Sequence, residues 1–173
     1  VTRVEDTPDT PTIASRVDHL TTTFPRPYRP WQAGDTLKNV IVMVAHPDGR
    51  PEPLAIGVPG DREIDEKRLG AQLDPAEIQA FGEADFEKNP HLARGYMGPG
   101  VLGENATSKI RYLLDPRVVD GTVWVTGADA PARPVIGLVA GRDVPADGTS
   151  EAGGGRARDQ CPTRAQRAGG ARG

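Results

Sequence analysis

The sequence predicts a single α/β (α+β) domain in which helices surround a mixed β-sheet. Residues 38–44 are almost entirely apolar, which is typical of a central strand covered on both faces. Further short apolar segments follow, separated by stretches with helical spacing and by turns that contain glycine or proline. A length of 173 residues suits one domain with a substantial hydrophobic core.

The first half of the chain is expected to form a helix, a hairpin and a second, exposed helix. Asp9 is a capping residue and Pro11 falls early in the first turn, where its missing N–H has no consequence. A stripe of Ile13, Val17 and Leu20 has helical spacing. The later elements are an extended connector over 24–30, strands over 38–44 and 53–58 joined by a turn at 46–49, and a helix between residues 60 and 70.

The second half is expected to contribute short helices and three more strands. Asp74-Pro75 predicts the start of a helix with Ile78 and Phe81 on its inner side. A short helix over 84–88 should end at Asn89-Pro90. The three strands are expected over residues 110–114, 122–125 and 135–139.

Composition bounds the class of protein. Aromatic residues make up only 5% of the chain, so the core must consist mostly of Val, Ile, Leu and Ala. The net charge of −3 shows no basic excess of the kind found in proteins that grip long nucleic-acid backbones. The lone Cys161 rules out an internal disulfide and a cysteine-based zinc site. With no apolar window of membrane-spanning length and no signal-peptide pattern, we expect a soluble, cytoplasmic protein.

The chain divides into three expected regions. Residues 1–9 are polar and expected to be flexible, and residues 10–145 form the domain. Residues 146–173 are expected to be disordered, because the stretch from 151 onward has six glycines and five arginines against two acids and lacks a periodic apolar pattern.

The residue patterns alone give no complete catalytic set. His19, His46 and His91 lack metal-ligand spacing, and no serine has the context of a nucleophile elbow. The glycine loop over residues 98–103 is either an ordinary turn before a strand or a place where backbone N–H groups approach a ligand.

Two charged residues at strand ends have two interpretations each. Lys38 stands at the start of the most apolar strand, where its ammonium either extends to solvent or meets an anion. Asp115 follows the strand over 110–114 and either forms the turn or points into a pocket. Composition alone favours the solvent-exposed interpretation for Lys38.

Seven segments in order resemble the editing domain that bacterial-type prolyl-tRNA synthetases carry as an insertion. They are residues 6–13 (DTPDTPTI), 35–42 (DTLKNVIV), 60–69 (GDREIDEKRL), 98–103 (GPGVLG), 114–115 (LD), 127–129 (GAD) and 141–143 (GRD). The resemblance implies the YbaK-like deacylase fold, a mixed sheet surrounded by helices. It also implies hydrolysis of the ester between alanine and tRNA(Pro). Small apolar groups differ in binding free energy by only about 1–3 kcal/mol, so a synthetase needs a second site that removes the wrong amino acid.

The resemblance also implies roles for particular residues, without a metal, a cofactor or a covalent nucleophile. Lys38 and Asp115 would be the catalytic residues: Lys38 would engage the terminal adenosine or its phosphate, and Asp115 would shape the pocket and hold the substrate ammonium. Backbone N–H groups of Gly98, Gly100 and Gly103 would hold the ester carbonyl. Pro134 stands in the substrate pocket where the family commonly has a histidine.

The implied partner is the aminoacylated 3′ end of tRNA(Pro), with no DNA and no membrane, bound by a monomeric domain. No ligase motif is visible, and Glu104 stands where many relatives have proline. Residues 159–162 (DQCP) resemble the return to the synthetase, so the chain is either a synthetase fragment whose reading frame is lost afterwards or a free-standing copy. The alternatives are a catalytically silent domain that binds tRNA ends and a small-ligand-binding α/β domain.

Overall fold

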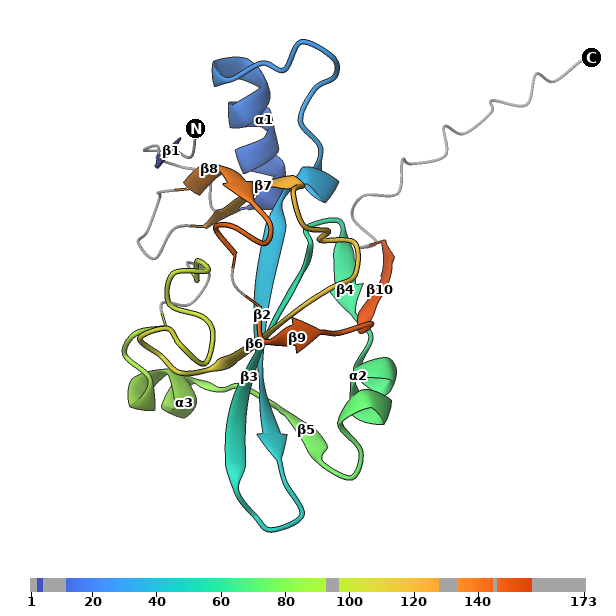
Figure 1. The fold of residues 1–173 in the computed structure, drawn as a ribbon, viewed down its shortest axis with the longest axis vertical. Coiled ribbons are helices and arrows are strands. Elements are labelled where there is room, and N and C mark those ends of the chain that lie inside the picture. The colour runs from blue at the N-terminus through green and yellow to red at the C-terminus, as the bar shows by residue number, and fades with distance from the viewer. Residues whose placement is uncertain (1–2, 5–11, 93–96, 128–133, 145, 157–173) are drawn as a thin grey trace, which may run out of the picture.

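In the part of the chain that it describes, the computed structural model shows a mixed α+β fold with three sheets and few helices (Figure 1). It describes residues 3–4, 12–92, 97–127, 134–144 and 146–156. The elements in chain order are β1 (Arg3–Val4), α1 (Ile13–Thr23), the 3-10 helix η1 (Ala33–Asp35), β2 (Leu37–Ala45), β3 (Pro51–Pro59), β4 (Arg62–Ile64), α2 (Glu66–Leu73), β5 (Glu77–Ala80), α3 (Glu83–Lys88), β6 (Arg111–Leu114), β7 (Val123–Gly127), β8 (Pro134–Val139), β9 (Gly148–Thr149) and β10 (Gly153–Arg156). No helix in these ranges is long and apolar enough to cross a membrane.

A long hairpin of β2 and β3 forms the centre of the largest sheet. The five strands have the order β5-β2-β3-β6-β9, antiparallel from β5 to β3 and parallel from β3 to β9. The apolar segment predicted as a central strand is confirmed as β2, which pairs with β3 over its whole length and with β5 on its other side. Sheets β1-β8-β7 and β10-β4 complete the fold.

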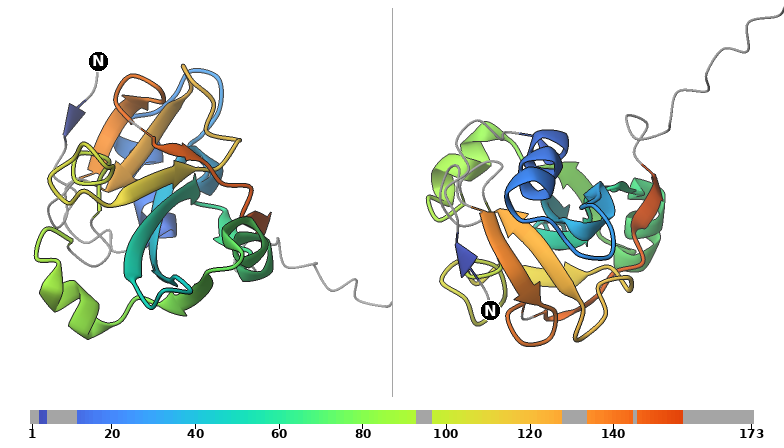
Figure 2. Two further views of the ribbon diagram at one scale, coloured as in Figure 1. Left: turned by 60° about the horizontal axis from the view of Figure 1, so that its bottom comes forward. Right: turned by 90° about the horizontal axis from the view of Figure 1, so that it is seen from above.

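The five-stranded sheet has a hydrophobic cluster on each face, and the two views in Figure 2 show elements on both sides of it. We call one side the α2 face, where these residues pack together: Val44, Leu54, Ile56, Val58, Leu69, Leu113 and Ala152. We call the other side the loop face, where the cluster includes Leu37, Ile41, Ala55, Leu102, Tyr112, Leu114, Trp124 and Leu138. The alternation of side chains along each strand separates the two clusters.

Helix α1 packs against the three-stranded sheet β1-β8-β7 through a third hydrophobic cluster. Its buried Leu20 contacts Trp31 and Val125, which belong to the connector after α1 and to β7. The helix begins at Ile13 because the Thr12 side chain accepts the Ser15 N–H, and the Ser15 hydroxyl accepts the Thr12 N–H in return. Residue 12, not residue 9, is thus the cap; residues 5–11 lie outside the described part.

Two helix predictions in the next segment need correction. The segment from Asp74-Pro75 does not start a helix: residues Glu77–Ala80 form strand β5, which pairs with the outer side of β2. Pairing with an open strand edge outweighs the local helix signal there. The helix predicted between residues 60 and 70 begins only at Glu66, after strand β4, because Asp65 caps it by accepting the N–H groups of Lys67 and Arg68.

Both ends of the described chain contain more structure than the sequence predicts. Arg3–Val4, within the segment 1–9 expected to be flexible, pair with β8. In the region 146–173 expected to be disordered, β9 pairs with β6 and β10 pairs with β4. Ser150 and Ala152 between these strands are fully buried, so the fold extends at least to Arg156. Residues 157–173 lie outside the described part.

Candidate functional site

Lys38 and Asp115, the two predicted catalytic residues, lie on the same face of the five-stranded sheet. Lys38 pairs with Val58 across the β2–β3 hairpin. Leu114 pairs with Gly57, so Asp115 follows beside Val58, and its N–H donates to the Gly57 carbonyl at 2.8 Å. Side chains in register point to the same side of a sheet, which assigns both polar groups to the α2 face.

Lys38 is partly buried and directed to the neighbouring strand β4. Its Nζ donates to the Arg62 carbonyl oxygen at 2.5 Å. Burial holds the pKa of the Lys38 ammonium below its ordinary value, and the carboxylates of Glu63 and Asp61 oppose this shift. The ammonium has three donors, so it can bind an anion while it keeps the bond to β4.

Asp115 is buried and engaged by a neighbouring cation. Its carboxylate accepts the Arg117 backbone N–H at 2.8 Å and Arg117 Nη1 at 3.2 and 3.0 Å. Arg117 Nη1 also reaches the Gly153 carbonyl of β10 at 3.4 Å. Because Arg117 contacts both of its oxygens, Asp115 restrains Arg117, and a substrate ammonium would have to compete with that guanidinium.

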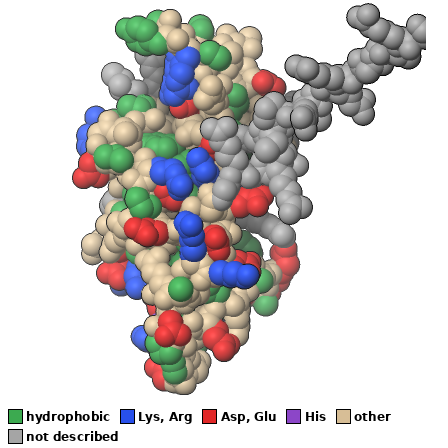
Figure 3. All heavy atoms as spheres, turned by 90° about the vertical axis from the view of Figure 1, so that its right-hand side faces the viewer, with side chains coloured by type: hydrophobic (Ala, Val, Ile, Leu, Met, Phe, Trp, Pro, Cys, Tyr) green, Lys and Arg blue, Asp and Glu red, His purple; other side chains and the backbone are tan. Residues whose placement is uncertain are grey.

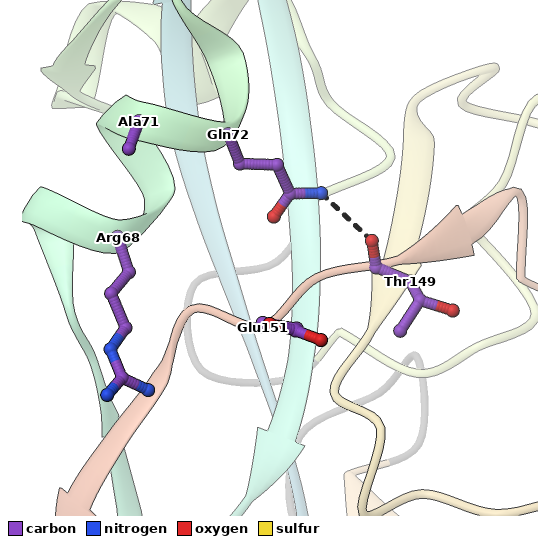
Figure 4. A pocket seen from close by; sticks show the side chains of 5 residues that line it. All are labelled: Arg68, Ala71, Gln72, Thr149 and Glu151. Atoms are coloured by element: carbon purple, nitrogen blue, oxygen red, sulfur yellow. Dashed lines mark hydrogen bonds between the residues drawn. The ribbon is translucent and has the colours of Figure 1, made fainter.

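Asp115 lines the first of two adjoining cavities on the α2 face. This cavity of about 310 Å³ is lined by Arg68, Asp115, Pro116, Arg117, Glu151 and Gly153. A second cavity of about 580 Å³ shares Arg68 and Glu151 and continues along α2 past Ala71, Gln72 and Thr149 (Figure 4). We call the two together the α2 groove. Figure 3 shows Lys and Arg side chains down the middle of the face that carries α2 and β10, with acidic side chains beside them.

The segment between β9 and β10 is fixed to α2 through one glutamine. Gln72 Nε2 donates to the Thr149 carbonyl at 2.9 Å, and the Ser150 hydroxyl donates to Gln72 Oε1 at 2.9 Å. The walls of the α2 groove are therefore joined by hydrogen bonds, and Glu151 follows directly after the fixed residues.

The glycine loop lies on the loop face, opposite Lys38 and Asp115. Leu102 is fully buried in the loop-face cluster, and Asn39 Nδ2 donates to the Met97 carbonyl at 2.7 Å. Gly103, with φ of +121°, donates its N–H to the Ile110 carbonyl, so this N–H does not face a ligand. The Gly100 N–H makes no hydrogen bond to another described residue and lies at a cavity of about 280 Å³. Gly98 is buried.

The sequence patterns did not indicate Asp147, which holds the glycine loop in place. Its Oδ2 accepts the N–H groups of Tyr112 at 2.8 Å and of Glu104 at 3.0 Å. The Tyr112 hydroxyl in turn donates to Asn39 Oδ1 at 2.6 Å. Asn39, a polar residue inside an apolar strand, was the one signal of this network, because an amide that loses contact with water requires hydrogen-bond partners.

Pro134 is the first residue of β8, and its backbone pairs with Gly127 of β7. Its side chain and residues 128–133 lie outside the described part, so its contact with a substrate stays a prediction. Within the described ranges, His, Cys, Asp and Glu side chains form no group of three suited to hold a metal.

The fold and its cavities define a small α+β domain with ligand-sized cavities on two faces of a mixed sheet. Residues 7–143 match the family model of the aminoacyl-tRNA editing domain. The chain belongs to this family.

Curated relatives agree with this assignment. The chain is 61% identical over 159 residues to a proline–tRNA ligase of Kineococcus radiotolerans, with 92% of the chain covered. It is 59% identical to the proline–tRNA ligase of a Nocardioides species and 57% identical to that of Cutibacterium acnes. The chain spans 27% of the length of each of these enzymes, which is consistent with the editing insertion of a prolyl-tRNA synthetase.

Two solved structures are similar in fold. The hypothetical protein APE2540 aligns with a TM-score of 0.55 at 16% identity, covering 78% of this chain and 79% of that protein. A scaffold protein from work on epitope backbone grafting by computational design aligns with a TM-score of 0.65 at 14% identity, covering 89% of this chain and 88% of that protein.

Proposed function

We propose that this chain hydrolyses the ester that links alanine to tRNA(Pro). The observation that carries the proposal is the match to the editing-domain family over residues 7–143, together with relatives that are proline–tRNA ligases. A synthetic site for proline cannot exclude the smaller alanine by size, so a separate hydrolytic site is needed. Water attacks the ester carbonyl, and the products are alanine and tRNA with a free terminal hydroxyl.

Lys38 is the residue on which the proposed activity depends most. Its partly buried ammonium is held on the α2 face by the Arg62 carbonyl and keeps donors for an incoming anion. In this proposal Lys38 binds the terminal adenosine phosphate and thereby fixes the ester. Asp115 shapes the neighbouring cavity and holds Arg117 in place.

A direct test measures the loss of radiolabelled alanine from alanyl-tRNA(Pro), with prolyl-tRNA(Pro) as the competing substrate. We expect faster loss of alanine than of proline, a large decrease in rate with Lys38→Met, and partial activity with Lys38→Arg. Lys88→Met, which changes an exposed lysine at the end of α3, is the matched control and should leave the rate unchanged. An unchanged rate of alanine loss in a folded Lys38→Met variant would show that Lys38 does not have this role.

The second candidate is a catalytically silent domain that binds tRNA ends. Two observations favour it: Pro134 stands where the family commonly has a histidine, and the glycine loop lies on the opposite face from Lys38. If alanyl-tRNA(Pro) is bound but is lost only at the spontaneous rate, the silent domain is the better description.

A further inference from the structure

The α2 groove is lined by charges of both signs. Arg68 and Arg117 contribute two cations, and Asp115 and Glu151 contribute two anions. A lining with no net charge does not favour a simple anion or a simple cation, whereas a ligand that carries both charges fits it.

Arg117 is a fixed cation with donors to spare. Asp115, whose side chain is fully buried, engages only its backbone N–H and Nη1, while the Arg117 side chain stays 46% exposed. Within the described chain, the other guanidinium nitrogens of Arg117 have no hydrogen-bond partner. A buried carboxylate behind an exposed guanidinium restrains its position and leaves its remaining face to a ligand.

Arg68 and Glu151 are the adaptable groups of the groove. Arg68 extends from α2, its side chain is 64% exposed, and its Nε lies 3.6 Å from Asp65. Glu151 lies exposed in the turn between β9 and β10 and lines both cavities (Figure 4). Its carboxylate has no ion-pair or hydrogen-bond partner among the residues that the structure describes, in contrast to Asp115.

We propose that the α2 groove binds an aminoacylated nucleotide end, with Glu151 as the acceptor of the aminoacyl ammonium and Arg68 and Arg117 as the donors to its phosphates. The ligand carries one cation beside its anions, as the lining requires. Glu151, and not Asp115, accepts the ammonium, because the carboxylate of Asp115 is already bound by Arg117. This assignment rests on the proposed function, because it names the part of the substrate that the groove recognises.

The test is a binding measurement that does not require hydrolysis. Two fluorescently labelled RNA oligonucleotides of one sequence ending in CCA serve as probes: one carries alanine through a stable 3′-amide, the other has a free 3′-hydroxyl. Fluorescence anisotropy gives the Kd of each probe for the full chain and for Glu151→Gln. Glu87→Gln, an exposed acid on α3, is the matched control.

We expect Glu151→Gln to weaken binding of the alanyl probe by about threefold to tenfold and to leave the hydroxyl probe unchanged or slightly tighter. N-acetylation of the alanyl probe should weaken its binding to the wild-type chain and abolish the effect of the variant. Arg68→Gln should weaken both probes and lower the salt dependence of both. Arg50→Gln, at the exposed β2–β3 turn, is the control for charge alone.

Equal effects of Glu151→Gln on both probes, or none, overturn the assignment. The experiments distinguish a failure of this assignment from a failure of the proposed deacylase activity. Selective loss of alanyl-probe binding without any hydrolysis of alanyl-tRNA(Pro) supports the groove and contradicts the deacylase. Hydrolysis that is insensitive to Glu151→Gln, with both probes bound equally, supports the deacylase and contradicts the groove.

Discussion

Gly153 lies so close to Asp115 that a Cβ at residue 153 would come within 1.8 Å of Asp115 Oδ2 and 3.0 Å of Arg117 Nη1. The absence of a side chain at this point of β10 lets the strand pass over the buried carboxylate. The pairing of β10 with β4 and the ion pair of Asp115 with Arg117 therefore depend on the same glycine.

Gly153→Ala should lower the free energy of unfolding by about 1–3 kcal/mol, because either β10 or the Asp115–Arg117 pair must move. Urea unfolding followed by circular dichroism measures the change. Gly70→Ala in α2 is the matched control: its Cβ would meet only Ile78 at 3.9 Å, and alanine should stabilise the helix by about 0.5–1 kcal/mol. Equal stability of the two variants would contradict the close approach.

Tyr112→Phe should destabilise the domain by about 1–3 kcal/mol, because Asn39 Oδ1 loses its donor inside the sheet. Burial raises the pKa of the Tyr112 hydroxyl far above its ordinary value, so the wild-type bond persists at alkaline pH. Tyr28→Phe removes the hydroxyl of a side chain that is 96% exposed and should change nothing measurable. The comparison is made by thermal unfolding; a neutral Tyr112→Phe would show that the hydroxyl is not needed.

Asp35 should make stability depend on pH in the acid range. Burial alone would raise the pKa of this carboxyl, but hydrogen bonds from Arg29 and the Gln32 N–H, with the charge of Arg26, hold it below its ordinary value of 3.8. A lowered folded pKa means that the stabilisation is present above pH 3.8 and is lost as the pH falls through the folded value.

Asp35→Asn should therefore cost about 1 kcal/mol at pH 7 and progressively less in acid. Trp31, whose ring lies 3.4 Å from the Arg26 guanidinium carbon, contributes to the fluorescence that reports the urea midpoint. Asp48→Asn, on the exposed turn after β2, is the control for the removal of one carboxylate from the surface. A difference between wild type and Asp35→Asn that stays constant down to pH 2 would count against the assignment.

Removal of residues 146–156 should unfold or strongly weaken the domain, because it takes away β9, β10 and the buried Ser150 and Ala152. A chain of residues 1–145 should be less stable than a chain of residues 1–156 by about 3 kcal/mol or more. Differential scanning calorimetry of the two truncated chains measures the difference in melting temperature. Equal melting temperatures for the two truncations would restore the boundary expected from composition.

Strong local patterns made part of the fold predictable from the sequence. The continuous apolar run of β2 and the hairpin with β3 follow from the residues themselves, as does the helix α3 before Asn89. Strand β5 was not predictable, since Ile78 is its only apolar residue apart from Ala80, and the strand exists because β2 offers a free edge. Glycine-rich β10 likewise has no local signal and is defined by its partner β4.

The candidate site was predictable to a smaller extent. Lys38 and Asp115 stand out in the sequence as isolated charges at strand ends, and the register of β2, β3 and β6 brings them to one face. The cation nearest to Asp115 was visible two residues along the chain as Arg117, but its approach to Gly153 was not. Arg68 and Glu151 line the same cavity only in the folded chain, since more than eighty residues separate them in the sequence.

The late position of β9 and β10 also bears on how the protein is made. Their partners, β6 and β4, are synthesised much earlier, and the fully buried Leu69 and Val58 share a cluster with Ala152. While a ribosome is still adding the residues after β8, that apolar surface has no cover, and such long-range pairing forms slowly. The nascent chain is thus more prone to aggregation before β9 and β10 emerge than after they have paired.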